Sequence, residues 1–135
     1  MANVADNLKR VLAAEDNAAL LGVVRFNLEK AGFEVQTARN GRLAWEALEQ
    51  SPFDLVVTDQ QMPELTGEEL CRRMRSDARF VDVPVIMLTA KCLELNRAML
   101  RDELRIFEVL SKPFSPRELV QTVHACLADH ATAQP

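Results

Sequence analysis

Reactive side chains stand at the ends of four apolar runs of this chain. They are three carboxylates, one hydroxyl and one ammonium, contributed by Glu15, Asp16, Asp59, Thr89 and Lys112. Each run is typical of a buried parallel strand. Because ligands of open α/β sheets bind beyond the carboxyl ends of the strands, we expect these groups to meet at one edge. Their combined chemistry is that of a phosphate site assisted by a cation.

The three acids are candidate metal ligands. Magnesium prefers hard oxygen ligands, usually one or two carboxylates together with water and a phosphate oxygen. Glu15, Asp16 and Asp59 supply such a set if the first and third strands are neighbours. A single acid after a strand can instead cap the following helix, and this alternative is strongest for Asp16. Three clustered carboxylates repel one another, which favours a site that a cation fills.

Asp59 is the candidate nucleophile, because a carboxylate can attack a phosphoryl group to form an acyl phosphate. Lys112 would supply a compact positive charge for phosphate oxygens. A cis peptide bond before Pro113 would aim this lysine inward. The Thr89 hydroxyl either satisfies local backbone groups or contacts the phosphoryl group, for which the small Ala90 leaves space.

Strand and helix signals alternate along the whole chain, which predicts a doubly wound α/β fold with parallel strands. We expect five strands, at about residues 9–14, 34–38, 54–58, 85–88 and 106–110. Five helices follow them, over residues 17–31, from Asn40 to before Pro52, from Thr66, over 93–104, and from Ser115. The predicted core-facing side chains of the helices are Leu20, Val24, Leu28, Ala31, Leu43, Ala44, Ala47, Leu48, Leu70, Cys71, Met74, Leu119, Val123 and Leu127. Residues 1–7 and 130–135 are expected to fray.

The composition restricts the class of protein. A chain of 135 residues predicts one domain, and its net charge of −4 argues against direct nucleic-acid binding. The three cysteines, Cys71, Cys92 and Cys126, have neither metal-ligand spacing nor a disulfide framework, which favours a reducing compartment. The first residues do not form a secretory signal, and no apolar run is long enough to insert into a membrane. We therefore expect a cytoplasmic protein.

The pattern resembles a response regulator receiver domain from about residue 9 to residue 128. Four motifs carry the resemblance: Glu15-Asp16-Asn17, Asp59-Gln60-Gln61-Met62-Pro63 with Gly67, Thr89-Ala90, and Lys112-Pro113-Phe114. Each motif is weak alone, but their order and spacing together are specific.

The resemblance implies a flavodoxin-like parallel sheet of order 2-1-3-4-5 with five helices on both faces. It implies a single receiver domain over residues 1–135, with a core of about 8–128 and short tails. Asp59 would be the phosphoacceptor, and Thr89, Ala90 and Lys112 would contact the phosphate. Mg²⁺, or alternatively Mn²⁺, would be held by the three acids and the backbone carbonyl of Gln61.

The resemblance also implies partners rather than a separate enzymatic output. The donor would be a sensor histidine kinase or a histidine phosphotransfer protein, with acetyl phosphate as a substitute. An output protein or a second copy would bind the face formed by helix 4, strand 5 and helix 5. On helix 4, Arg97 and Arg101, with Leu95 and Met99 on a second stripe, form either a solvated charged face or part of that docking surface.

This chain departs from the family pattern at a few positions. The family usually has an aromatic residue three positions before the lysine, where its rotation couples to the threonine, and here that position is Val109. The expected switch pair is therefore Thr89 with Val109, and Phe107 on the same side of the strand is a partial substitute. Gln61 and Lys91 occupy positions that in the family tune the loss of the phosphate to water.

Three alternative functions differ from this interpretation in the residues that they require. An aspartate-nucleophile phosphatase would need a second acid two residues after Asp59, where this chain has Gln61. A nucleotide- or flavin-binding module would need a glycine-rich loop after the first strand, where this chain has Glu-Asp-Asn. A receiver fold that binds partners with atypical or no phosphorylation-dependent switching stays open because of Val109.

Overall fold

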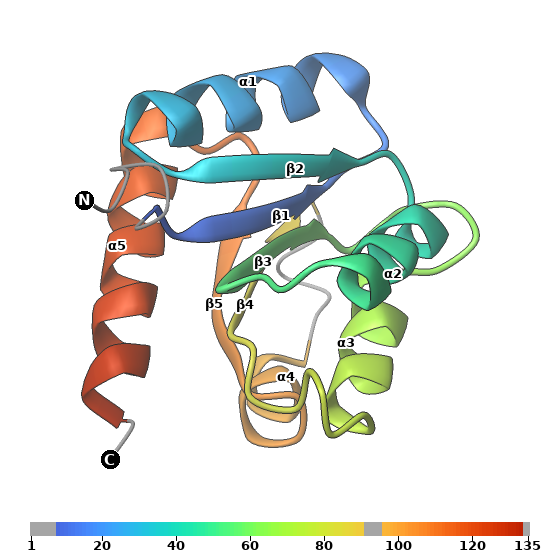
Figure 1. Ribbon diagram of the computed structural model, residues 1–135. Helices are drawn as coiled ribbons and strands as arrows, with labels where there is room; N and C mark the ends of the chain where they lie inside the picture. The colour runs from blue at the N-terminus through green and yellow to red at the C-terminus, as the bar shows by residue number, and fades with distance from the viewer. Residues whose placement is uncertain (1–7, 91–95, 134–135) are drawn as a thin grey trace.

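The computed structural model describes residues 8–90 and 96–133. In this part of the chain strands and helices alternate as predicted (Figure 1). The strands are β1 (Arg10–Ala14), β2 (Glu34–Ala38), β3 (Leu55–Asp59), β4 (Val85–Thr89) and β5 (Ile106–Ser111). The helices are α1 (Ala18–Lys30), α2 (Gly41–Gln50), α3 (Gly67–Arg75), α4 (Arg97–Asp102) and α5 (Pro116–Ala133).

The strands form one parallel sheet in the order β2-β1-β3-β4-β5. This confirms the flavodoxin-like doubly wound architecture. Strand β1 therefore lies between β2 and β3, and the order reverses there. The acids after β1 and at the end of β3 reach the same edge of the sheet as a result.

Helices cover both faces of the sheet (Figure 1). On one face, alternate strand residues such as Val11, Val57 and Leu88 pack against buried side chains of α1 and α5. On the other face, the intervening strand residues pack against α2, α3 and α4. Strands β3 and β4 are buried along their entire length because both of their faces are covered.

Local sequence signals fix where the helices begin. The Asn17, Asn40 and Asn96 side chains accept hydrogen bonds from backbone N–H groups in the first turns of α1, α2 and α4. Thr66 and Glu69 form a capping box at the start of α3. Gly32 has a φ of +100°, a left-handed conformation that glycine adopts readily, just after α1 ends.

Two predicted details of the helices were wrong, in α2 and α5. In α1 the predicted Leu20 and Ala31 are partly buried and pack against the core, and Leu21 is buried as well. In α2 Leu43 is exposed, because the small residues Ala44 and Ala47 set the face of the helix that contacts the sheet. Helix α5 continues to Ala133, although fraying was expected from residue 130.

Two further comparisons concern α4 and α5. The structure starts α4 at Arg97, and Leu95 with the rest of residues 93–95 lies outside the described residues. In α5 Leu119, Val123 and Cys126 are buried, and Leu127 is partly buried. None of the helices in residues 8–90 and 96–133 has the length and apolar character that crossing a membrane requires.

Candidate functional site

Glu15 and Asp59 lie side by side because β1 and β3 are neighbours in register. Ala14 pairs with Thr58, so Glu15 follows β1 at the level where Asp59 ends β3. The Glu15 N–H donates to the carbonyl of Ala38 at 3.0 Å, which holds the backbone after β1 against the end of β2. Both carboxylates are buried. Parallel strand pairing therefore places two acids side by side in a nearly water-free position.

Asp16 completes a cluster of three carboxylates. One carboxylate oxygen from each of Glu15, Asp16 and Asp59 lies within 4.8 Å of the others, and Asp16 is exposed to solvent. The donor set consists of hard oxygen atoms, which suits Mg²⁺. With Lys112 as the ammonium that contacts the cluster, the four groups carry a formal charge of −2. This chemistry fits a divalent cation.

Lys112 joins the two buried acids. Its Nζ lies 2.8 Å from Glu15 Oε1 and 3.1 Å from Asp59 Oδ1. The Lys112–Pro113 peptide bond is cis, the isomer expected to aim the lysine inward. The Lys112 N–H donates to the carbonyl of Thr89 at 2.8 Å, which links the ends of β4 and β5. Residues 15, 59 and 112, far apart in the sequence, thus meet at one edge of the sheet.

The environment shifts the ionisation of two of these groups. Burial raises the pKa of Glu15, and the nearby charge of Asp59 adds to this effect. Hydrogen bonds from the Lys112 ammonium and from the Asn17 N–H act in the opposite direction but are outweighed. Burial acts to lower the pKa of Lys112, yet Glu15 and Asp59 outweigh it and raise the pKa. The ammonium is therefore held in its charged form beside the acids.

Thr89 and Ala90 lie at the end of the neighbouring strand. Asp59 pairs with Leu88, so Thr89 stands one residue beyond the level of the acid, where it pairs with Ser111. Thr89 is buried and Ala90 is exposed. Lys91, predicted to tune the loss of a phosphate, lies outside the described residues.

The loop after Asp59, residues 60–66, is closed by hydrogen bonds at its base. The Gln60 N–H donates to Leu88 O on β4 at 2.9 Å, and the Gly67 N–H donates to Gln60 O at 3.0 Å. The Gln60 side-chain oxygen also accepts from the Glu68 N–H at 2.8 Å, a cap that the sequence analysis missed. Gln61 is exposed and lies two residues beyond Asp59. Its carbonyl as a metal ligand stays a prediction.

Val109 lies on β5, away from the acidic cluster. It is half-buried against the core beneath α4. Val109 and Phe107 line one small cavity of about 70 Å³ together with Leu100 and two arginines of α4. A bulge interrupts the pairing of β4 and β5, so Ile86 pairs with Glu108 directly after the Val85–Ile106 pair. Phe107 and Val109 both line this cavity, and Phe107 is 37% exposed at the bulge.

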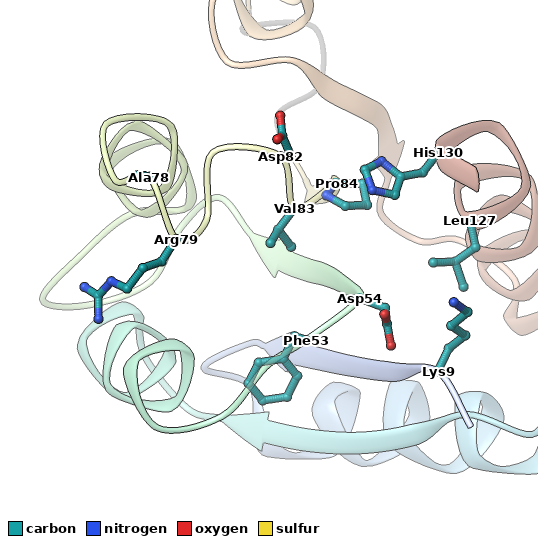
Figure 2. A pocket seen from close by; sticks show the side chains of 10 residues that line it. All are labelled: Lys9, Phe53, Asp54, Ala78, Arg79, Asp82, Val83, Pro84, Leu127 and His130. Atoms are coloured by element: carbon teal, nitrogen blue, oxygen red, sulfur yellow. The ribbon is translucent and has the colours of Figure 1, made fainter. Parts of the chain in front are cut away.

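A larger hollow lies at the opposite, amino-terminal edge of the sheet (Figure 2). It has a volume of about 320 Å³. Its walls come from residues just before β1, β3 and β4 and from the end of α5, and they include Lys9, Asp54, Pro84, Leu127 and His130. Its lining includes the cations of Lys9 and Arg79 and the anions of Asp54 and Asp82, and the acidic cluster is not part of it.

The comparison with known protein families agrees with this geometry. The sequence model of the response regulator receiver domain matches residues 11–124. The chain belongs to this family. The match covers the acids after β1, the end of β3 and Lys112, so the receiver domain includes all elements that build the cluster.

Two bacterial transcriptional regulators are similar to this receiver domain in sequence. The alkaline phosphatase synthesis transcriptional regulatory protein PhoP of Bacillus subtilis is 35% identical over 127 residues, which cover 94% of this chain and 52% of PhoP. The phosphate regulon transcriptional regulatory protein PhoB of Pseudomonas aeruginosa is 38% identical over 119 residues, which cover 88% and 52%. The chain spans about half the length of these relatives.

Solved structures give the same fold. The chemotaxis response regulator CheY4 of Vibrio cholerae aligns with a TM-score of 0.81 at 29% identity, covering 89% of this chain and 99% of CheY4. The receiver domain of the sensor histidine kinase PA1611 from Pseudomonas aeruginosa also has a TM-score of 0.81, at 27% identity, covering 90% and 98%. A magnesium ion is coordinated in the active-site cleft of that receiver domain.

Sequence reasoning missed one partly buried cation of this receiver domain. The guanidinium of Arg75, at the end of α3, donates to the carbonyls of Leu104 and Val83, both at 2.7 Å, and to Val81 at 3.1 Å. Burial lowers the pKa of Arg75. The residue joins the segments before β4 and β5. No local signal distinguishes it from the exposed arginines 72 and 73 beside it in the sequence.

Proposed function

We propose that this receiver domain accepts a phosphoryl group on Asp59 from a phosphohistidine donor, with Mg²⁺ bound beside it. The observation that carries the proposal is the position of Lys112 Nζ between Glu15 and Asp59, with three carboxylates clustered around one point. Belonging to the receiver family supports the same conclusion. The domain would work in the cytoplasm as one receiver unit over residues 1–135.

Glu15, Asp16, Asp59 and the backbone carbonyl of Gln61 would hold the metal, and Mn²⁺ is the alternative cation. When bound, the metal neutralises negative charge on the phosphoryl oxygens and on the acids. The magnesium ion in the similar receiver domain of PA1611 supports this assignment. Burial raises the pKa of Glu15 because it destabilises the charged carboxylate. A cation bound nearby would stabilise that carboxylate.

The reaction forms one bond and breaks one. A carboxylate oxygen of Asp59 attacks the phosphorus, the phosphorus–nitrogen bond of the donor breaks, and the released imidazole takes up a proton. The transfer depends mainly on positioning and on charge neutralisation. Lys112 would bind a phosphoryl oxygen, and Thr89 and Ala90 would border the transferred group.

The donor would be a sensor histidine kinase or a histidine phosphotransfer protein. The phosphorylated domain would then relay the phosphate or change its affinity for an output protein or a second copy through the face of α4, β5 and α5. Affinity for a partner changes only as far as that partner discriminates between the two states. The domain would have no separate enzymatic output.

A labelling experiment tests the proposal. The protein is incubated with Mg²⁺ and acetyl phosphate, and its mass is followed with and without the metal chelator EDTA. We expect one added phosphate that depends on Mg²⁺ and is absent in Asp59→Asn. Asp54→Asn is a matched control, because Asp54 directly precedes the strand that Asp59 ends. Equal labelling of Asp59→Asn and the wild type would reject Asp59 as acceptor.

Trp45 provides a second readout in the same experiment. It lines the groove between α2 and α3 together with Leu65 of the loop after Asp59. Movement of that loop should therefore change its fluorescence when Mg²⁺ and the phosphate mimic beryllofluoride bind.

Val109 favours a second candidate function, a receiver fold that binds partners with little phosphorylation-dependent switching. The side chain is small where the family usually has an aromatic ring, and a cavity of about 70 Å³ lies beside it. Amide proton shifts of residues 97–109, with and without beryllofluoride, distinguish the two candidates. Shifts along α4 and β5 would support the switch, and unchanged resonances would support the partner-binding module.

A further inference from the structure

The first residue of α2 lies in very close contact with the loop after Asp59. A Cβ atom added to Gly41 would lie 2.2 Å from the carbonyl oxygen and 2.4 Å from the Cβ of Leu65. Real Cβ atoms essentially never approach other heavy atoms closer than 3.0 Å. The obstacle is backbone, which cannot rotate away as the end of a flexible side chain can. Only glycine therefore allows α2 and the loop to pack at this distance.

The loop has little freedom to absorb a displacement. Its two ends are joined by the hydrogen bond from Gly67 N–H to Gln60 O, and Gln60 is itself bonded to β4. Met62 in its middle is buried in the core. A Cβ on Gly67 would lie 2.5 Å from the carbonyl of Asp59, so the loop is also tightly packed against α3. Any shift of Leu65 must be distributed over residues 61–66.

A second contact joins the same two elements at the surface. Arg42 Nε lies 3.3 Å from Glu64 Oε1, and both side chains are about half exposed. Glu64 has a φ of +69°, an uncommon conformation for a residue with a side chain. The helix and the loop thus meet through one buried backbone contact and one exposed ion pair.

We infer that Gly41 is a positioning residue for the metal site: it sets the place of the loop that carries the Gln61 carbonyl and follows Asp59. The inference rests on the proposed function, because Gln61 matters only if the site binds Mg²⁺. Gly41 lies on α2 and contributes no ligand atom. It acts through the backbone of Leu65.

The test compares Gly41→Ala with Gly22→Ala. Gly22 is a matched control on α1, where an added Cβ would meet nothing within 4 Å. Mg²⁺ affinity is measured by isothermal titration calorimetry. Changes to residues that support metal ligands typically weaken binding about 10- to 100-fold, and we expect at least the lower value for Gly41→Ala. Gly22→Ala should bind Mg²⁺ with the affinity of the wild type, because its added Cβ meets nothing.

Two further readouts separate positioning from a general loss of structure. In metal-free protein, amide resonances of residues 60–67 should shift in Gly41→Ala, while those of α5 should not. Raising the Mg²⁺ concentration should restore phosphorylation by acetyl phosphate toward the wild-type rate. Unchanged Mg²⁺ affinity in a folded Gly41→Ala protein would overturn the inference, even if its stability were reduced.

The experiment distinguishes a failure of this inference from a failure of the proposed function. If the wild type itself binds no Mg²⁺ and takes up no phosphate, the proposed function fails and the inference falls with it. If the wild type binds and Gly41→Ala binds equally well, only the inference fails. Should Gly41→Ala not fold, Arg42→Ala provides the test, because it removes the second contact without adding an atom. We then expect about twofold weaker Mg²⁺ binding, as for an exposed ion pair, and unchanged binding would overturn the inference.

Discussion

The two edges of the sheet differ in how their charged groups are arranged. At the carboxyl edge two buried acids, Glu15 and Asp59, share one ammonium from Lys112. At the amino edge the hollow of Figure 2 is open and is bordered by cations and anions in similar number. It has a volume of about 320 Å³ and holds no cluster of like charge. The two edges therefore differ in the chemistry of their charged groups.

At the amino edge, charged groups have partners outside the hollow. Asp82 pairs with Arg105 at 3.8 Å, and the carboxylate of Asp54 accepts the Arg10 N–H at 2.8 Å. Arg79 pairs with Asp77 at 2.8 Å. Such groups stabilise loops and need no ligand. The carboxyl edge instead concentrates excess negative charge in a buried position, which is costly unless a cation binds. Charge imbalance therefore distinguishes the carboxyl edge from the amino edge.

The largest expected difference between the two edges is in the phosphorylation rate after the lysine at each edge is replaced. In Lys112→Ala the transferred phosphoryl group loses its fixed cation, and removal of one such group typically slows a reaction about 100- to 1000-fold. Lys9→Ala, at the hollow, should stay within about twofold of the wild type. Mass spectrometry of the acetyl phosphate reaction at saturating Mg²⁺ gives both rates. Similar rates for the two variants would show that the edges do not differ as argued.

Arg75 tests whether the cations near the amino edge are structural. Arg75→Ala leaves several partly buried carbonyls without this donor, and we expect a loss of about 3 kcal/mol in the free energy of unfolding. Arg72→Ala, on the same helix but exposed, should cost about 0.5 kcal/mol. Urea unfolding measures both. Phosphorylation of folded Arg75→Ala should remain within about twofold of the wild type. Equal stability of the two variants would refute the structural role.

Some features of the fold and of the site could be predicted from local sequence signals, and others could not. Apolar periodicity and helix starts near Asn17, Asn40 and Thr66 predicted the elements, because these signals are local. The strand order came only from the resemblance to a family, since periodicity does not say which strands are neighbours. The acids and Lys112 could be expected to meet, because the carboxyl ends of parallel strands share one edge.

Long-range packing accounts for what the sequence did not reveal. The Gly41 contact with Leu65 spans 24 residues, and Arg75 bonds carbonyls of two separate segments. Neither a glycine nor an arginine lies in a local sequence pattern that identifies its contact partner. Leu43 was wrongly placed in the core because the exact rotation of α2 depends on which small residues contact the sheet. These features follow from how elements pack, which is settled only in three dimensions.

The pH dependence of the unfolding free energy should distinguish the buried acid Glu15 from exposed acids. Because burial raises the pKa of Glu15 above its ordinary value, ionisation of this group opposes folding. The penalty is absent below the ordinary pKa and is complete above the raised one. Without metal, Glu15→Gln should therefore be more stable than the wild type at pH 8, and the difference should shrink as the pH falls toward the ordinary pKa of a glutamate. Urea unfolding in EDTA at several pH values checks this.

The control for this series is the exposed acid Asp82. Asp82→Asn should change the unfolding free energy by about 0.5 kcal/mol or less, because it removes only a long surface ion pair. Added Mg²⁺ should stabilise the wild type more than Glu15→Gln, since a ligand stabilises in proportion to its binding. A Glu15→Gln protein less stable than the wild type at pH 8 would mean that the Lys112 pairing outweighs burial.

A small expected effect concerns Asp54, which directly precedes β3, the strand that Asp59 ends. Its carboxylate accepts one backbone hydrogen bond, from the Arg10 N–H, so Asp54→Ala should cost about 1 kcal/mol of unfolding free energy. Asp54→Asn keeps an acceptor oxygen and should cost less than about 0.5 kcal/mol. Neither change should alter Mg²⁺ affinity, which calorimetry can verify. An effect of Asp54 on metal binding comparable to that of Asp59 would mean that the strand transmits charge effects between its two ends, and the contrast between the edges would then lose its basis.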